Sequence, residues 1–456
     1  MAGMALMLLM ASGAAHAANL PALPPLSKPA SAQLANGLRL FVLPDSRAPV
    51  VTHVIAYRVG SKDDPPEQTG LAHYLEHLMF KPTENAPTPP YARQIETEGG
   101  VFNAFTSKSI TAYYATVPRA ALTDVMAWEA ARMNRLVLDD AAAQTERDVI
   151  LEERNARVDS RPAALLWEAM QQKLFDGTRF AAPIIGSRAH IATYRAADAR
   201  RFYRCHYHAA NALVVLIGDI SMGDAQALAE RYYGGAPAGK PCAPPAPPPQ
   251  AAPSDWSQPL IRRDARAQVP LWQKLYRLPA DDRRTQQDWL ALDLMAHILG
   301  GEKSGRLHRA WVVDEPRFTH ISAWLDDSAP DAAYVGLQAV PHADGDPDAS
   351  RSTAEALAAL AAEPVSDEEL QRAKTALLAR LYYAQDDQQH LALFYARRLA
   401  NGWPLAELVQ LPTQLQAVTA AGVQQAAQLV QSLPALEGVL LAQDSEDGED
   451  GGEAEQ

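Results

Sequence analysis

The pattern of apolar and polar residues changes period several times along the chain. Residues 38–46, 51–60 and 269–279 form short stretches that alternate or run apolar and are rich in branched and aromatic side chains, which is typical of β-strands. Residues 70–80 and 289–301 instead repeat apolar positions at helical spacing. Each half of the chain is therefore expected to begin with strands that lead into a helix.

The same order of elements continues in both halves. Strand patterns recur at residues 111–118 and 332–341, and long Ala-rich helical patterns follow at 121–136 and 367–385. The strands come in hairpin-like groups, and the helices are placed too irregularly for strict strand–helix alternation. The pattern predicts an α+β fold of two similar domains, each a mainly antiparallel sheet flanked by helices.

Length and composition support this division. A chain of 456 residues with 48% hydrophobic residues can bury two cores. Residues 237–253 (PAGKPCAPPAPPPQAAP) cannot sustain a helix, because proline lacks a backbone donor, so they are interpreted as an extended linker. The predicted domains are then residues 19–236 and 254–443.

The N-terminal and C-terminal segments differ in composition from the rest of the chain. The apolar run from Met4 to Met10 is too short to span a bilayer and is followed by small residues, so residues 1–18 are interpreted as a signal peptide. The expected location is the periplasm or the outside of the cell. Residues 444–456 carry seven of the acidic residues and are expected to be a disordered tail. The net charge of -13 argues against a nucleic-acid partner.

The thiols are Cys205 and Cys242. Two cysteines are too few for a disulfide framework, and their spacing matches no zinc ribbon. Whether they pair stays open, because sequence cannot test the geometry of a disulfide.

The helix around residue 75 carries candidate metal chemistry. His73, Glu76 and His77 lie three or four positions apart, so their side chains share one helix face. Two imidazoles at this spacing can bind one zinc ion, and the glutamate between them could activate water. An ordinary amphipathic helix is the alternative, and a catalytic zinc site would require a third protein ligand.

The acidic segment that begins at residue 144 offers that ligand. Glu146 and Glu153 are seven residues apart and therefore lie on one helix face, whereas Glu152 points about 100° away from Glu153. Spacing alone does not choose among these acids, and an acidic helix is often only a solvated one.

Five segments in order carry a family resemblance. Residues 70–83, with the order H-x-x-E-H, then 95–118, 146–154, 202–220 and 298–311, resemble the M16 peptidases, which include pitrilysin, insulin-degrading enzyme and the mitochondrial processing peptidase. The resemblance covers nearly all of the chain after the signal peptide. It is closest in form to a two-domain bacterial subunit that carries the zinc site.

The resemblance implies a role for each residue. His73, His77 and Glu153 match the zinc ligands, Glu76 matches the general base, and Glu146 matches the supporting acid beside the site. The implied activity is that of a zinc metalloendopeptidase that hydrolyses unstructured peptides or small proteins.

The same resemblance places residues 99–107 (GGVFNAFTS) at a sheet edge beside the zinc, where an extended peptide can add by backbone hydrogen bonds. Asn103 and Ala104 are expected closest to the substrate, and Phe105 is expected in the pocket wall or the core. These three are the candidate substrate-binding residues. An ordinary internal strand is the alternative.

One part of the family pattern is missing. Many M16 proteins carry an Arg and a Tyr in the second half, and ungapped comparison places those positions at Val312 and Thr319. Neither side chain can replace them, because valine donates no hydrogen bond and threonine is too short. We therefore expect a partner, a homologous M16 subunit that supplies the pair in a heterodimer. The alternatives are a non-catalytic assembly or binding subunit and a processing peptidase with one dedicated substrate.

Overall fold

The computed structural model describes most of the chain. The described residues are 26–84, 90–240, 242–243, 256–280, 284–301, 303–342 and 348–442. The predicted signal peptide, the acidic tail and most of the proline-rich linker lie outside them.

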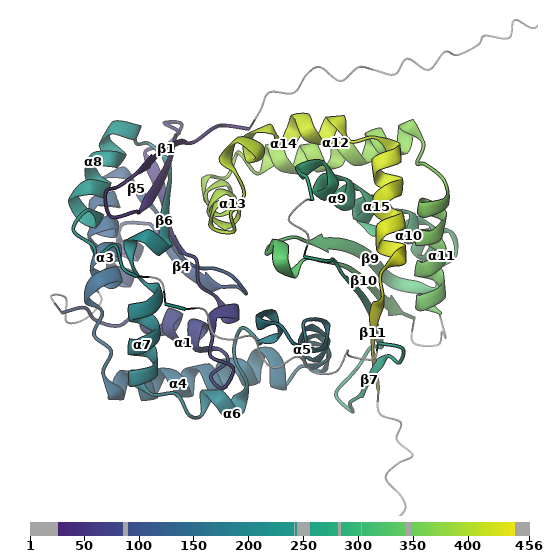
Figure 1. The fold of residues 1–456 in the computed structure, drawn as a ribbon, viewed down its shortest axis with the longest axis horizontal. Helices are drawn as coiled ribbons and strands as arrows, with labels where there is room; N and C mark the ends of the chain where they lie inside the picture. Colours follow the sequence, from purple (N-terminus) through teal and green to yellow (C-terminus); the bar gives the residue numbers. More distant parts are fainter. Residues whose placement is uncertain are drawn as a thin grey trace, which may run out of the picture.

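The strands form two sheets (Figure 1). The first sheet contains β1 (Ala30–Gln33), β2 (Arg39–Pro44), β3 (Val50–Tyr57), β4 (Val101–Thr106), β5 (Thr111–Pro118) and β6 (Ala212–Gly218) in the order β1-β2-β6-β3-β5-β4. The second contains β7 (Leu260–Arg263), β8 (Leu271–Arg277), β9 (Phe318–Asp326), β10 (Tyr334–Pro341) and β11 (Ala435–Leu441) in the order β7-β11-β8-β10-β9.

Apart from β1, the two sheets have the same topology. In each, the first strand pairs in parallel with the last, and every other pair is antiparallel. In each, the third strand in chain order, β4 or β9, lies at the edge. The predicted α+β class with two similar, mainly antiparallel sheets is confirmed.

Fifteen α-helices are described. In the first half they are α1 (Leu71–Leu78), α2 (Pro90–Thr97), α3 (Leu122–Arg135), α4 (Asp140–Arg154), α5 (Pro162–Leu174), α6 (Arg188–Ile191), α7 (Ala196–His206) and α8 (Met222–Tyr233). In the second half they are α9 (Gln286–Gly300), α10 (Arg306–His308), α11 (Ala349–Ala362), α12 (Asp367–Tyr383), α13 (Gln388–Ala400), α14 (Leu405–Ala417) and α15 (Ala420–Ser432).

The two halves exchange helices. Side chains of β6 alternate between faces, with Val214 and Leu216 in a cluster with α1, α3, α7 and α8, and Val215 in a cluster that contains α13 residues. Helix α13 of the second half therefore covers the inner face of the first sheet (Figure 1). Conversely, α5 of the first half packs on β11, where Gly438 leaves room for Met170. The linker near residue 240 divides the sequence, but helices from each half pack on the sheet of the other half.

The segment that opens the predicted linker is attached to the first half. Cys205 and Cys242 form a disulfide, which settles the pairing that the sequence left open. The backbone amides of Ala209 and Ala210 donate to the carbonyls of Pro237 and Ala238. In the described part of the chain, no helix has the length and apolar character needed to cross a bilayer.

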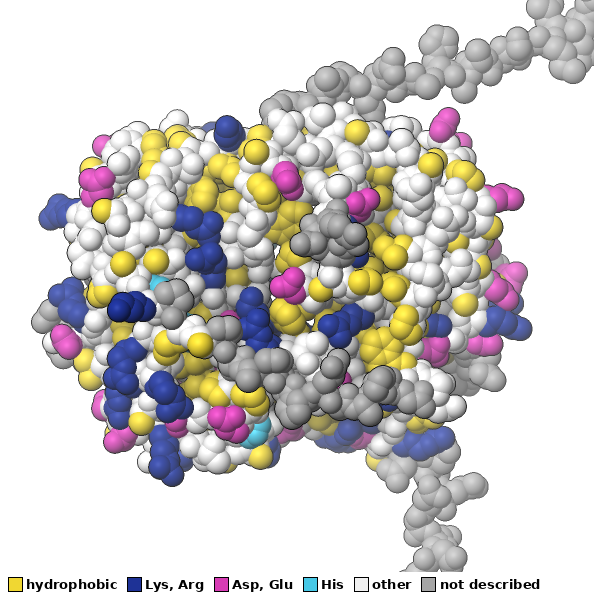
Figure 2. All heavy atoms as spheres, in the orientation of Figure 1, with side chains coloured by type: hydrophobic (Ala, Val, Ile, Leu, Met, Phe, Trp, Pro, Cys, Tyr) yellow, Lys and Arg dark blue, Asp and Glu magenta, His cyan; other side chains and the backbone are white. Residues whose placement is uncertain are grey.

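Surface charge is uneven on the face shown in Figure 2. Lys and Arg side chains gather over the first half, acidic side chains are scattered, and hydrophobic side chains show between the halves. Seven acidic residues of the chain lie in the tail outside the described residues. Much of the negative net charge is therefore concentrated in the C-terminal tail, and the charged side chains on the face of the first half in Figure 2 are mainly basic.

Candidate metal centre

The position of α1 is fixed by its first turn. Asp64 is buried, and its carboxylate accepts hydrogen bonds from the backbone amides of Gly70 (2.6 Å) and Ala72 (2.8 Å). This carboxylate satisfies amides that have no partner within the helix. Gly70 has φ +93°, and a Cβ there would lie 2.4 Å from the carbonyl oxygen of Ile185. Only glycine lets the start of α1 approach this loop so closely.

Helix α4 lies against α1. Its first turn is capped by Asp139, whose side chain accepts from the amide of Ala142. The hydroxyl of Tyr74 in α1 donates to the carbonyl of Ala143 in α4 over 2.6 Å. After Arg154 the helix continues as a π-helical turn, η3 (Asn155–Asp159), a local geometry that is frequent at functional sites.

The two helices bring three candidate ligands together. His73, His77 and Glu153 each offer one donor atom, and these atoms lie within 4.8 Å of one another. Oε2 of Glu153 lies 3.2 Å from Nε2 of His77 and 3.7 Å from Nε2 of His73. Of the acids that spacing left open, Glu153 faces the histidines, whereas Glu152 is exposed.

Glu146 contacts the opposite side of His77. Nδ1 of His77 lies 3.3 Å from Oε2 of Glu146, whose other oxygen accepts from Lys81. If Nδ1 of His77 carries the proton and donates it in a hydrogen bond to Glu146, Nε2 is unprotonated. Nε2 is the atom that lies on the side of Glu153, where it could bind a metal ion. Burial lowers the pKa of His77, but the hydrogen bonds to Glu146 and Glu153 outweigh it and raise that pKa to about 9. Burial lowers the pKa of His73 to about 4.

The second oxygen of Glu153 is also held. Nη1 of Arg157, one helical turn later, lies 3.0 Å from Oε1 of Glu153. The carboxylate is thereby oriented with Oε2 toward the histidines. The pKa of Glu153 is lowered, chiefly by the hydrogen bond to His77.

Glu76 is buried on the same face of α1 as both histidines. Its Oε2 accepts a 2.5 Å hydrogen bond from the hydroxyl of Thr106 at the end of β4. Burial raises the pKa of the Glu76 carboxyl, and the hydrogen bond from Thr106 opposes this effect. A positioned carboxylate with a raised pKa suits the role of a base.

The donor atoms open into a cavity of about 650 Å³. The candidate substrate-binding residues Asn103, Ala104 and Phe105 line it together with His73, Glu76, His77, Glu146 and Glu153. Strand β4 pairs with β5 on one side and ends the sheet on the other. The prediction of an edge strand is therefore correct, and the internal-strand alternative is wrong.

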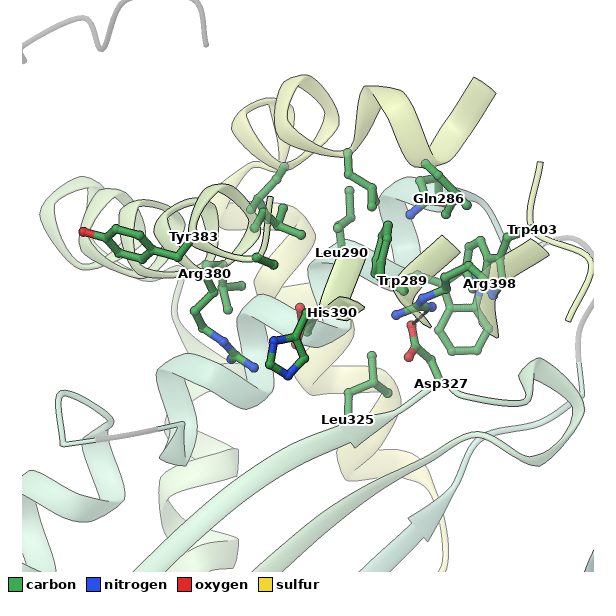
Figure 3. A pocket seen from close by; sticks show the side chains of 18 residues that line it. Gln286, Trp289, Leu290, Leu325, Asp327, Arg380, Tyr383, His390, Arg398 and Trp403 are labelled. Carbon is green, nitrogen blue, oxygen red and sulfur yellow. Dashed lines mark hydrogen bonds and ion pairs between the residues drawn. The ribbon is translucent and has the colours of Figure 1, made fainter. Parts of the chain in front are cut away.

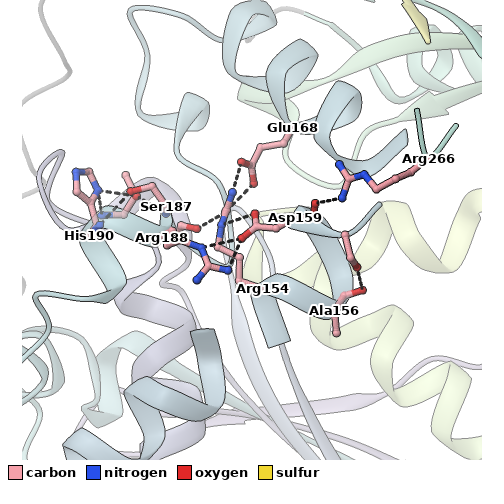
Figure 4. A network of polar contacts seen from close by, with 11 residues as sticks. Arg154, Ala156, Asp159, Glu168, Ser187, Arg188, His190 and Arg266 are labelled. Atoms are coloured by element: carbon pink, nitrogen blue, oxygen red, sulfur yellow. Dashed lines mark hydrogen bonds and ion pairs between the residues drawn. The ribbon is translucent and has the colours of Figure 1, made fainter. Parts of the chain in front are cut away.

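A polar network lies at the end of α4, the helix that carries Glu153 (Figure 4). The buried Arg154 donates to both carboxylate oxygens of Glu168 (2.8 and 3.1 Å) and pairs with Asp159 at 3.1 Å. Asp159 also pairs with Arg188, and its carbonyl accepts from Arg266 of the second half. The network thus connects the residue next to Glu153 with both halves of the molecule.

The positions expected for an Arg and a Tyr lie elsewhere in the fold. Val312 is half-buried in η6 (Arg309–Asp314) and packs against the core of the second half. Thr319 is exposed on β9, and its hydroxyl donates to the carbonyl of Val340. Neither lines the cavity at His73.

The arrangement fits a zinc ion. Two imidazole nitrogens and one carboxylate are the donor set of a catalytic zinc site. Oε2 of Glu153 is buried and faces both histidines, 3.2 Å from Nε2 of His77 and 3.7 Å from Nε2 of His73. When both imidazoles are neutral and present unprotonated Nε2 atoms, three electron-pair donors face one another, an arrangement that a bound cation would stabilise.

Comparison with known proteins gives the family. The family model described as insulinase (peptidase family M16) matches residues 40–188, and the peptidase M16 inactive domain matches residues 194–377. An uncharacterized zinc protease of Mycobacterium bovis is 30% identical over 72% of this chain and 74% of its own length. The chain belongs to the peptidase M16 family.

Other M16 relatives agree. The zinc protease PqqE of Helicobacter pylori is 28% identical over 66% of this chain and 69% of its own length. A probable mitochondrial-processing peptidase subunit beta of Schizosaccharomyces pombe is 28% identical over 46% of each chain. The solved structure of a protease from H. pylori has a TM-score of 0.84, 23% identity, and coverage of 92% of this chain and 100% of that one, which confirms the fold.

Reasoning from the sequence did not identify several contacts of this M16 site. Lys81 is four residues after His77, and Arg157 is four after Glu153, so helical spacing could have indicated both. Thr106 gave no such signal, because only the fold brings the end of β4 to Glu76.

Proposed function

We propose that this chain is a zinc-dependent endopeptidase that hydrolyses peptide bonds in unstructured peptides or small proteins in the periplasm. The convergence of His73, His77 and Glu153 beside the buried Glu76 is the observation that carries the proposal. The membership in a family whose relatives are named zinc proteases supports it. The periplasmic protease PqqL from Escherichia coli shares the fold, which supports the proposed export.

Each residue of the site has a task. A bound zinc ion supplies Lewis acidity and lowers the pKa of water toward about 7. His73, His77 and Glu153 would hold the ion. Glu76 accepts the proton of the attacking water and can return it to the departing amine. The free edge of β4 offers backbone groups to an extended substrate, which explains how many sequences could be accommodated.

We further propose that the chain is the zinc-bearing subunit of a heterodimer with a homologous M16 subunit. Val312 and Thr319 stand where an Arg and a Tyr are expected, and neither lines the cavity at His73. The partner would supply that pair from the facing side of a peptide chamber.

Hydrolysis of a mixed set of quenched peptides tests both proposals. The purified chain is expected to cleave weakly or not at all alone and to cleave strongly after addition of the homologous subunit. The same mixture made with Glu76→Gln should be inactive. Strong cleavage by the chain alone, abolished in Glu76→Gln, would support the peptidase and exclude the need for a partner. No cleavage in any mixture would favour a non-catalytic assembly subunit.

A further inference from the structure

A second large cavity lies in the other half of the molecule. Its volume is about 780 Å³, and its walls come from α9, α12, α14, the end of β9 and the exchanged helix α13 (Figure 3). It shares no lining residue with the cavity at His73. The candidate metal centre therefore does not account for it.

Aromatic side chains form one wall of this cavity. Trp289 and Trp403 are buried and meet edge to face with ring centroids 5.9 Å apart. Phe394 and the leucines of α14 extend the apolar surface. The indole Nε1 of Trp403 and Oε1 of Gln286 are buried without a hydrogen-bond partner among the described residues. A ligand or ordered water at this wall could satisfy both polar atoms.

Two charged side chains line the cavity without an ion pair. Within the described parts of the chain, neither Asp293 nor Arg380 has an acid–base contact, although Asp327 and Arg398 beside them are joined at 2.6 Å. Burial, together with the nearby Asp327 carboxylate, raises the pKa of Asp293 to about 6. His390, which also lines the cavity, pairs instead with Asp387.

Asp293 and Arg380 line one cavity and attract each other electrostatically, but no close ion pair joins them in the described structure. Asp293 is half-buried, and a half-buried charge without an ion pair lowers stability unless something compensates it, whereas Arg380 is exposed and its guanidinium stays accessible to a ligand. The side chains are of opposite sign and border an aromatic wall. These features together match a ligand that carries an ammonium group, a carboxylate and an apolar side chain.

We propose that this cavity binds an apolar amino acid or short peptide with free termini. Its ammonium group would pair with Asp293, its carboxylate with Arg380, and its side chain would pack against Trp289 and Trp403. The site is separate from the metal centre, so the proposal does not depend on catalysis by the chain.

Titration calorimetry with the dipeptide leucyl-phenylalanine tests this inference. We expect saturable binding by the full chain that weakens at least tenfold in Asp293→Asn and in Arg380→Gln. The exposed Asp386, which does not line this cavity, provides a control, and Asp386→Asn should bind like the native chain. Circular dichroism would verify that each variant is folded.

Blocked dipeptides give an independent measurement that needs no variant. The N-acetyl form loses the ammonium group and the C-terminal amide loses the carboxylate, so each should bind at least tenfold more weakly than the free dipeptide. Equal affinity of the native chain for all three forms, or equal affinity of Asp293→Asn, Arg380→Gln and the native chain for the free form, would overturn the proposal. Absence of binding at millimolar concentration would overturn it too. Peptide hydrolysis plays no part in these measurements, so failure of the proposed function would be seen separately.

Discussion

At the scale of the residue, Glu146 is proposed to orient His77, a proposed ligand, without binding the metal itself. Its carboxylate contacts Nδ1 of His77, and Lys81 holds its other oxygen. The contacts of Glu146 with Lys81 and with Nδ1 of His77 orient the imidazole so that Nε2 faces Glu153. Contacts of this kind to metal-binding histidines typically contribute ten- to a hundredfold to metal affinity.

Replacement of Glu146 by alanine is therefore expected to lower zinc affinity about ten- to a hundredfold. Competition with a chromophoric chelator measures this change. Glu152→Ala is the matched control, because Glu152 is on the same helix but exposed, and its affinity should equal that of the native chain. Equal zinc affinity in Glu146→Ala would show that Glu146 does not position His77.

The carboxyl of Asp293 predicts a pH effect on stability. Its pKa is about 6 in the folded chain, where Asp327, Arg380 and Arg398 face it, and about 3.9 when unfolded. Below about pH 3 the group is protonated in both states. As the pH rises to 6 the unfolded chain loses the proton first, so the free energy of unfolding falls and then stays lower.

Asp293→Asn removes this penalty. The free energy of unfolding should rise by about 3 kcal/mol at pH 8 and should not change at about pH 3. Urea denaturation at the two pH values measures the difference. A variant that is less stable than the native chain at pH 8 would mean that the charged form of Asp293 has a stabilising partner.

At the scale of the element, the sequence predicted the helices and strands that carry a clear period. The strand predicted at residues 51–60 is β3, and the helix predicted at 70–80 is α1. The shared face of His73, Glu76 and His77 followed from helical spacing alone. Glu153 could be chosen only through family resemblance, because the approach of α4 to α1 depends on long-range packing such as Tyr74 against Ala143.

The start of α1 gives a prediction at this scale. Gly70→Ala would add a Cβ 2.4 Å from the carbonyl oxygen of Ile185 as well as an unfavourable positive φ. Gly402→Ala is the matched control, because Gly402 has φ +91° but no atom within 4 Å of the added Cβ. We expect a loss of about 1 kcal/mol in the control, from backbone strain alone.

The loss in Gly70→Ala should be larger and should be accompanied by reduced zinc binding, because α1 carries two of the proposed ligands. Chemical denaturation and zinc content measure both effects. Equal destabilisation of the two variants would show that the close approach at Gly70 is unimportant.

At the scale of the whole molecule, the exchange of α5 and α13 makes each sheet depend on the other half. The apolar pattern of each helix indicated burial, but it could not indicate which sheet the helix covers. The inner face of the first sheet contacts α13, and Arg397 of this helix lies 4.1 Å from the centre of the Phe105 ring in the cavity at His73. The second half therefore contributes to the shape of the candidate metal centre.

The exchange predicts how fragments behave. Residues 19–243 expressed alone should expose the inner face of the first sheet and aggregate, since large apolar surfaces associate. Co-expression with residues 256–456 should give a soluble complex that copurifies. Size-exclusion chromatography distinguishes these outcomes, and a monomeric first fragment that unfolds cooperatively would contradict the interdependence of the halves.

Zinc content compared across three proteins tests the central claim most directly. The native chain and Glu76→Gln should both retain stoichiometric zinc after gel filtration, because Glu76 is assigned as the base and not as a ligand. Glu153→Ala should lose the metal, and peptide cleavage with the partner present should vanish in both variants. Full zinc occupancy in Glu153→Ala, or loss of zinc in a folded Glu76→Gln, would contradict the assignment of ligands and base.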